Sequence, residues 1–461
     1  MDGNVQAIQT PEAVDEEAIR NESEMSQVNL FNYQQNLFER ICTIEALELA
    51  FKAAKRNGGA PGVDGVTLEE FESRLPEELS RLKKDLESWA YEPSPVRRVE
   101  IPKPGNAGVR LLGIPTIRDR VLHGAIKAVL EPIFEEVFSN HSYGFRPSRN
   151  QRQAVEAAQR IVQSGKEHVV DIDLSKFFDR IHHDRLIYRL GFQVQDKRVL
   201  RLIGLTLRSG IMHDGVLSVP TEGSVQGSPL SPLLSNVVLD ELDQELERRG
   251  LEFCRFADDC NIFVKSQKAA ERVMQTVSKF IEKKLKLVVN REKSKVALSK
   301  GVKFLGMTII AGAIAISAKS MDRAMDKVKE LTPRGTSLSI EQTIEKINGW
   351  YVGWANYYKM TQYPIQLAAI EAHLRRRLRC RIVSQQKKRR HLFDKLVKRG
   401  VPRRLAAKTA YSNDKDWALS HSRAVQQAFS NRWFIQELGQ KIISDRNLPH
   451  WFSLRVYIRL T

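Results

Sequence analysis

Apolar residues recur at three- or four-residue intervals through most of the chain and alternate with polar residues only in short stretches. The helical spacing is clear at Leu122, Ile126 and Leu130. It returns over 30–55, 231–249 and 273–285, and again from Ser320 onward. Period-two alternation predicts short strands within 91–121, 168–174 and 251–264. The pattern therefore predicts an α+β protein whose C-terminal third is helical.

Two aspartates interrupt one of these apolar stretches. The sequence RFADDCNIF, Arg255 to Phe263, predicts a β-hairpin with Asp258 and Asp259 at its tip. Adjacent carboxylates in an apolar setting repel each other, and a divalent cation shared with a third carboxylate would lower that cost. A metal site is thus the first hypothesis, although aspartates at a hairpin tip are usually only turn formers.

The third carboxylate has a candidate upstream, in HVVDIDLSKFFDRI. Strand alternation places Asp171 and Asp173 on one face and Val170 and Ile172 on the other. Hard oxygen ligands without accompanying His or Cys favour Mg²⁺ over Zn²⁺. Taken alone, DLSKFFD also fits a strand that runs into a capped helix.

The length and composition of the chain limit the class of protein to which it can belong. A chain of 461 residues can hold roughly three domains. Its 42% hydrophobic and 28% charged residues are typical of a soluble globular protein. We find neither an apolar run of the roughly 20 residues that cross a bilayer nor a signal peptide, so we expect no membrane partner and a cytoplasmic location. The four cysteines form no CxxC pair, which argues against a zinc ribbon and fits a reducing compartment.

The formal charge of +18 indicates a polyanionic partner. Fifteen Lys and Arg stand against two acids over 371–410, more than a solvated surface requires. We interpret this window as a helical platform for a nucleic-acid backbone. The residues expected to bind nucleic acid are Arg375, Arg376, Arg377, Arg379, Lys387, Lys388, Arg389 and Arg390.

A second candidate binding element is a predicted hairpin over 91–121, with PGNAG as its turn. Lys103 and Arg110 flank that turn, so both cations can close over one anion. The plainer alternative is an exposed hairpin whose charges are solvated.

These blocks occur in an order that resembles a known family. NGGAPGVDGV, the DLSKFFD strand, TEGSVQGSPLSPLLSNVVLDELDQEL and the FADD hairpin together resemble the reverse transcriptases encoded by bacterial group II introns, of the compact type without an endonuclease domain. The resemblance implies a right-hand polymerase with fingers, an antiparallel-sheet palm and a helical thumb, followed by a basic α-helical extension. The expected parts are a mobile acidic tail (1–28), an N-terminal block with fingers (29–165), a palm (166–318), a thumb or maturase-specific domain (319–382) and a basic nucleic-acid-binding region (383–461).

The resemblance also implies roles for single residues. Asp173, Asp258 and Asp259 would be the catalytic residues and the ligands of two Mg²⁺ ions about 4 Å apart. Five residues would contact the incoming nucleotide or its template: Lys103, Arg110, Phe178, Gln226 and Lys293. Phe178 would exclude the 2′-hydroxyl, although core packing is an equal alternative. The family commonly has tyrosine at Phe256 and proline at Val225, so primer contact and turn geometry are open here.

The function implied is RNA-directed DNA synthesis by a protein that binds its group II intron RNA, assists splicing and copies the RNA during retrohoming. Its partners would be intron RNA, an RNA template, a DNA primer or target and dNTPs, with a place at the nucleoid when bound to DNA. Two alternatives remain open at this point: a host-adopted relative in phage defence, repair or a CRISPR locus, and a non-catalytic RNA-binding splicing factor. The flanking DNA and a primer-extension assay would separate them.

Overall fold

The structure is a computed structural model that describes residues 35–102, 108–213, 215–219, 222–224 and 227–441. Its backbone contacts divide the chain into two compact units. The first comprises Met1–Ala154 and Val170–Val296, and the second comprises Val155–Val169 and Ala297–Thr461. The five-part division expected from the sequence stays a prediction, and the acidic segment 1–28 lies outside the described residues.

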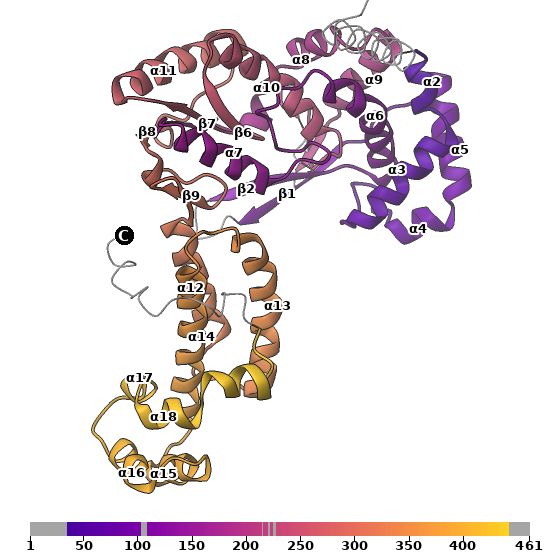
Figure 1. Cartoon of the computed structure of the whole chain (residues 1–461). Helices are drawn as coiled ribbons and strands as arrows, with labels where there is room; N and C mark the ends of the chain where they lie inside the picture. The colour runs from indigo at the N-terminus through magenta and orange to yellow at the C-terminus, as the bar shows by residue number, and fades with distance from the viewer. Residues whose placement is uncertain (1–34, 103–107, 214, 220–221, 225–226, 442–461) are drawn as a thin grey trace, which may run out of the picture. The chain divides into compact units, whose positions relative to one another are not determined.

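The first unit begins with a helical layer that packs around a long central helix (Figure 1). Thr116 caps that helix, α6, by accepting a hydrogen bond from the backbone N–H of Asp119. The helices before and including it are α2 (Leu37–Ile41), α3 (Ile44–Asn57), α4 (Leu68–Ser73), α5 (Leu75–Glu87) and α6 (Ile117–Glu135). The helical spacing predicted over 30–55 corresponds, in the described part of that segment, to α2 and α3, which are separated at Cys42 and Thr43.

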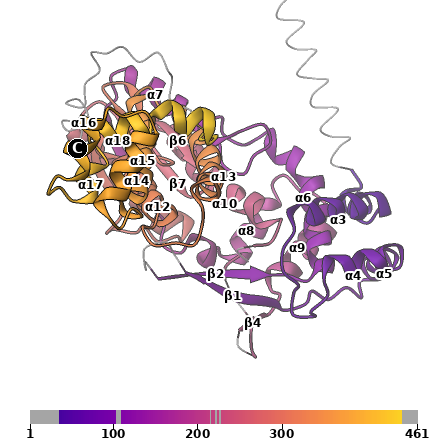
Figure 2. The same cartoon turned by 90° about the horizontal axis from the view of Figure 1, so that it is seen from below.

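A four-stranded sheet in the order β2-β1-β4-β5 follows this layer. Its strands are β1 (Val96–Pro102), β2 (Val109–Ile114), β4 (Ile211–His213) and β5 (Val216–Ser218). The expected hairpin is confirmed by the antiparallel pairing of β1 with β2, whereas β1 and β4 run parallel. Figure 2 shows β1 beside β2, with β4 beyond it.

A second four-stranded sheet, in the order β6-β7-β3-β8, carries the acidic segments. Its strands are β3 (His168–Ile172), β6 (Glu252–Phe256), β7 (Asp259–Val264) and β8 (Lys295–Leu298). The helical elements that accompany this sheet are α7 (Gln151–Gln163), η1 (Phe177–Arg180), α8 (His183–Leu190), α9 (Lys197–Leu207), α10 (Ser231–Arg248), α11 (Gln267–Phe280) and η2 (Ile281–Leu285). The β6–β7 pair confirms the predicted acidic hairpin.

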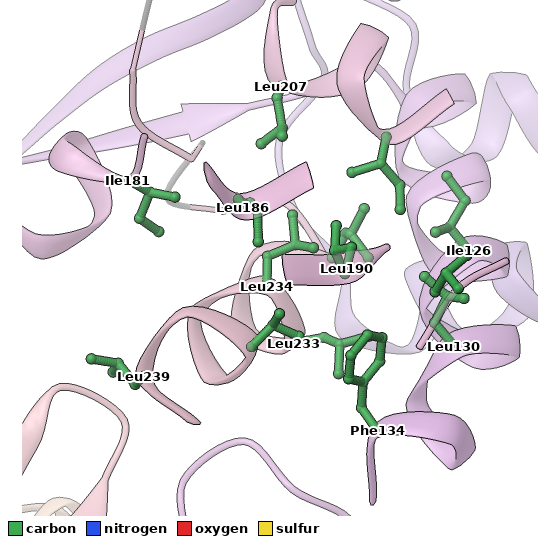
Figure 3. Packing of buried hydrophobic residues seen from close by; sticks show 14 of the residues in the cluster. Ile126, Leu130, Phe134, Ile181, Leu186, Leu190, Leu207, Leu233, Leu234 and Leu239 are labelled. Atoms are coloured by element: carbon green, nitrogen blue, oxygen red, sulfur yellow. The ribbon is translucent and has the colours of Figure 1, made fainter. Parts of the chain in front are cut away.

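The core of this unit is formed where the helices meet. Leucines of α8 and α10 and the apolar face of α6 converge in Figure 3, where side chains of the three helices interlock. The labelled residues there include Ile126, Leu130, Phe134, Leu186, Leu190, Leu233 and Leu234. Because α10 is anchored in this core, the hairpin that follows it starts from a fixed position.

The second unit is mainly helical, as the spacing beyond Ser320 predicts. It includes most of α7. Its elements after residue 297 are η3 (Ser299–Gly301), β9 (Met307–Ile310), β10 (Ala313–Ile316), α12 (Ala318–Leu331), α13 (Ile340–Tyr358), α14 (Ile365–Ser384), α15 (Arg389–Lys398), α16 (Arg403–Ala410), α17 (Asp416–Leu419), α18 (Arg423–Ala428) and η4 (Trp433–Glu437). Trp350, Trp354 and Tyr358 stack along α13, with Trp354 and Tyr358 ring centroids 4.3 Å apart. None of the described helices combines the length and the apolar character needed to cross a bilayer.

Two leucines of α3 provide a matched test of the core. Leu47 is 0% exposed and Leu49 is 66% exposed. We expect Leu47→Ala to lower the free energy of unfolding by about 2–5 kcal/mol, because it leaves a cavity between packed helices. Leu49→Ala removes an exposed side chain and should change it by less than about 0.5 kcal/mol. Urea denaturation measures both values, and equal losses would contradict this packing.

Candidate active site

The tip of the β6–β7 hairpin holds two carboxylates in a tight turn. Phe256 pairs with Asp259, so only Ala257 and Asp258 form the turn. Ala257 has φ 56, a left-handed conformation that costs a non-glycine residue energy unless its surroundings hold it. Asp258 is half-buried and Asp259 is exposed. The turn thus presents two acids from a backbone that needs external support.

Part of that support comes from a loop earlier in the chain. An added Cβ at Gly144 would lie 2.2 Å from the backbone nitrogen of Ala257, so the two backbones are in direct contact. The backbone N–H of Arg255 donates to the His141 carbonyl at 2.9 Å, and Tyr143 N–H donates to the Arg255 carbonyl at 2.8 Å. The SYGFRPS loop, Ser142 to Ser148, therefore lies next to β6 close to the hairpin tip and is hydrogen-bonded to its backbone.

Asp173 lies immediately after β3, and its backbone is held by the NREKS segment, Asn290 to Ser294. Its carbonyl accepts from the backbone N–H of Asn290 at 2.8 Å, and its N–H donates to Ser294 Oγ at 3.0 Å. Lys293 lies within the same segment and places Nζ 3.8 Å from Asp173 Oδ1. Its expected contact with the nucleotide stays a prediction. Sequence analysis assigned no role to Ser294, whose contact with Asp173 spans 121 residues of the chain.

The two acidic segments interact through their charges. Burial raises the pKa of Asp258, the nearby Asp173 carboxylate raises it further, and Arg110 is among the groups that oppose this rise. Burial also raises the pKa of Asp171 to about 6, with Lys295 opposing the rise and Asp259 and Asp173 adding to it. The strand and the hairpin tip therefore face a common negative region, which Arg110 of β2 also faces.

A cation fits the chemistry of this region, because burial and the nearby Asp173 carboxylate both raise the pKa of Asp258, and a bound cation would offset these effects. Among the described residues, no three His, Cys, Asp or Glu side chains are gathered closely enough to form a metal site by themselves. Mg²⁺ is usually held by one or two carboxylates together with substrate phosphates and water rather than by an all-protein cage. Asp173 and Asp258, with Asp259 beside them, are the residues that would hold it.

Phe178 lies in η1, five residues after Asp173. Its ring packs edge-to-face on Phe177 with centroids 5.2 Å apart, and the side chain is only partly buried against the core. Its carbonyl accepts from the backbone N–H of Ser224 at 2.7 Å. The Phe178 ring therefore packs against the core on one side and is exposed on the other. The exposed side is open to a ligand.

The glycine turn before α10 approaches the β1–β2 hairpin closely. Gly227 has φ 128, and an added Cβ there would lie 2.2 Å from the Gly113 carbonyl oxygen. His183 Nε2 lies 2.6 Å from the Gly223 carbonyl oxygen at the start of the turn. Lys103 and Gln226, with Val225 beside it, lie outside the described residues, so their expected nucleotide contacts stay predictions.

The basic window over 371–410 does not form one exposed platform. Arg375 and Arg379 of α14 are 8% and 7% exposed. Arg379 donates to the Phe429 carbonyl and to Asn431 Oδ1, and Arg377 donates to Thr332. Arg375 and Arg379 are therefore not part of an exposed platform, because α14 packs them against neighbouring helices, and their expected contact with nucleic acid stays a prediction.

The other residues expected to bind nucleic acid differ in how exposed they are. Arg376 is partly exposed, and its guanidinium carbon lies 4.1 Å from the centre of the Trp417 ring. Four consecutive residues, Lys387, Lys388, Arg389 and Arg390, are exposed at the start of α15. We call these four residues the exposed basic cluster. They are the part of the predicted platform that is open to a polyanion.

Two protein-family models match this chain. Residues 101–309 match the family model "Reverse transcriptase (RNA-dependent DNA polymerase)", and residues 321–400 match "Group II intron, maturase-specific domain". The chain is 34% identical over 317 residues to Protein YkfC of Escherichia coli K12, covering 60% of this chain and 83% of that protein. It is 29% identical over 276 residues to the group II intron-encoded protein LtrA of Lactococcus lactis, covering 60% of this chain but only 45% of LtrA. A solved chain of a Cas6-RT-Cas1–Cas2 complex is 27% identical, with a TM-score of 0.36, over 55% of this chain and 44% of that one.

Gly144 tests the contact that supports the tip. We expect Gly144→Ala to lower the free energy of unfolding by about 1–3 kcal/mol, because its Cβ would collide with backbone atoms that cannot rotate away. Gly204→Ala in α9 is the control, since an added Cβ there meets no atom within 4 Å. It should be neutral or stabilising by up to about 1 kcal/mol. If thermal and urea unfolding rank the two variants equally, the tip is not held by this approach.

Proposed function

The chain belongs to the group II intron reverse transcriptase and maturase family, and from that premise we propose that it extends a primer with deoxynucleotides on an RNA template at the carboxylates of β3 and the β6–β7 tip. The predicted α+β right-hand polymerase fold is confirmed by the reverse transcriptase family match. The observation that supports the proposed site is that the Asp173 carboxylate raises the pKa of the half-buried Asp258, although 85 positions separate the two residues in the sequence.

The proposed cofactor is a pair of Mg²⁺ ions at Asp173 and Asp258, with Asp259 in support. When bound, the ions lower the pKa of the primer 3′-hydroxyl and neutralise charge on the departing pyrophosphate. The protein's own contribution is to hold the acids at the ends of buried strands. Ser294 fixes the backbone of Asp173, and the SYGFRPS loop fixes the tip.

The nucleotide would be bound by groups around this acidic region. Arg110 already faces Asp258 and can donate two parallel hydrogen bonds to phosphate oxygens, with Lys103 as its partner across the hairpin turn. Lys293, exposed beside Asp173, would supply charge near the leaving phosphates. Phe178 would exclude a 2′-hydroxyl, and Gln226 would lie beside the templating base pair.

We further propose that the second unit binds group II intron RNA and assists its splicing. The maturase-specific family match supports a role in intron RNA recognition, and the exposed basic cluster offers four cations to phosphate groups. Splicing, retrohoming and a place at the nucleoid belong to this proposal. A host-adopted enzyme would retain the same chemistry and lack a flanking intron, so sequencing around the gene separates these roles.

Removing one carboxylate tests the polymerase site. We expect Asp258→Asn and Asp173→Asn each to reduce primer extension on an RNA template with Mg²⁺ by about 1,000-fold or more, because each deletes a ligand charge without changing side-chain size. RNA affinity should remain within about threefold of the parent chain, since a carboxylate offers no positive charge to phosphate groups.

Asp184→Asn is the matched control, because its side chain is 77% exposed in the same unit. It should leave extension unchanged. Extension that survives in both site variants would refute the site, and a parent chain without any extension activity would favour the non-catalytic RNA-binding alternative.

The exposed basic cluster is tested by the salt dependence of RNA binding. Replacing its four residues by Gln should lower the slope of log affinity against log salt by about 3, because each phosphate contact contributes about 0.7–0.9. Lys52, Lys55 and Lys83 are the control set, since each is paired with a glutamate on the first unit, away in sequence from the basic window. Replacing them by Gln should leave the slope unchanged. Equal effects of both sets would mean that net charge, not this cluster, controls binding.

A further inference from the structure

A buried arginine lies directly beneath the acidic tip. Arg255 of β6 is 1% exposed, and its counterion Asp243 of α10 is also 1% exposed. Arg255 Nε donates to both carboxylate oxygens of Asp243, at 2.7 and 3.0 Å. The guanidinium thus connects the hairpin to the middle of α10, a helix anchored in the core.

The remaining hydrogen bonds of the guanidinium are directed at the turn. Arg255 Nη1 donates to the Ala257 carbonyl at 2.9 Å and to Asn236 Oδ1 at 3.0 Å. Asn236 is 0% exposed, and its Nδ2 donates to the Gly144 carbonyl at 2.8 Å. One side chain therefore contacts the residue immediately before Asp258, and through Asn236 it also reaches the loop that packs on the turn.

This arrangement differs from what stability alone would select. A buried ion pair loses about as much energy on leaving water as it regains by attraction, and apolar replacements of similar volume are often neutral or stabilising. The two-residue turn between β6 and β7 needs a left-handed residue at its first position, and Ala257 adopts it at φ 56 although it is not glycine, so contacts around the turn must hold this strained backbone. A planar guanidinium can bind a carboxylate, an amide oxygen and a backbone carbonyl at once from a rigid fork of N–H groups. A lysine ammonium carries its three N–H groups on a single nitrogen, and an apolar side chain carries none.

We propose that Arg255 is a positioning residue for polymerisation. It fixes the Ala257 carbonyl, and so the direction in which Asp258 leaves the turn, while Asp243 balances its charge and Asn236 locks the turn to the loop at Gly144. The inference rests on the proposed polymerase function and deepens it. It predicts that geometry at the reacting centre, rather than nucleotide or RNA affinity, is lost when the guanidinium is removed.

A charge-balanced double variant separates positioning from stability. Arg255→Met alone leaves Asp243 buried without a counterion and should lower the melting temperature. Arg255→Met combined with Asp243→Leu removes both charges and should restore the melting temperature toward that of the parent chain. In the double variant we still expect kcat for primer extension to fall by about 100-fold, because the contact to Ala257 remains absent. KM for dNTP and affinity for RNA should stay within about threefold.

Recovery of kcat together with the melting temperature in the double variant would overturn the proposal, because the ion pair would then have a purely structural role. If the double variant fails to fold, Arg255→Lys decides, since it keeps the charge opposite Asp243 but cannot reach all three partners. It should lower kcat at least about 10-fold with RNA affinity intact, and an unchanged kcat would overturn the proposal. A parent chain without extension activity would instead contradict the proposed function.

Discussion

The repulsion between carboxylates that are held at the ends of buried strands is the constraint on which the active-site region depends. Half-burial of Asp258 and its proximity to Asp173 raise its pKa, so the folded protein pays for keeping these acids together. A fold tolerates such a cost only where surrounding contacts hold the groups in place. Those contacts come from segments far apart in sequence, namely the NREKS segment, the SYGFRPS loop and helix α10.

Helix α10 connects the two sides of the site. It begins after the glycine turn that approaches the β1–β2 hairpin, and its middle holds the counterion of Arg255 beneath the tip. Its leucines pack into the core formed with α6 and α8. A displacement of this helix would therefore affect both the glycine turn and the carboxylates.

The sequence predicted the local elements well, because their signals are local. The alternation around Asp171 and Asp173 and the two acids in an apolar hairpin correspond to β3 and the β6–β7 turn. Helix α10 ends just before Gly250, as expected, because that glycine adopts φ 64. Contacts between distant segments were not predictable in the same way. No feature of the sequence around Ser294 indicates its hydrogen bond to Asp173, and none around Gly144 indicates the close approach of its backbone to Ala257.

The basic window shows a second limit of sequence reasoning. Counting charges over 371–410 correctly identifies an excess of cations but cannot say which of them face solvent. In α14 the apolar positions Leu374 and Leu378 are buried, and Arg375 and Arg379 beside them are buried as well. Arg379 is satisfied there by a carbonyl and an amide oxygen. Only the tertiary packing distinguishes these arginines from the exposed basic cluster at the start of α15.

The central claim is that Asp173 and Asp258 together bind divalent metal when a nucleotide is present. The most direct measurement is a crystal structure of the protein with an RNA template, a DNA primer, a non-hydrolysable dNTP analogue and Mn²⁺, with the metal located by its anomalous scattering. The account predicts anomalous peaks bonded to carboxylate oxygens of both Asp173 and Asp258 and to the triphosphate. A complex with the analogue bound and no metal on these two carboxylates would contradict it.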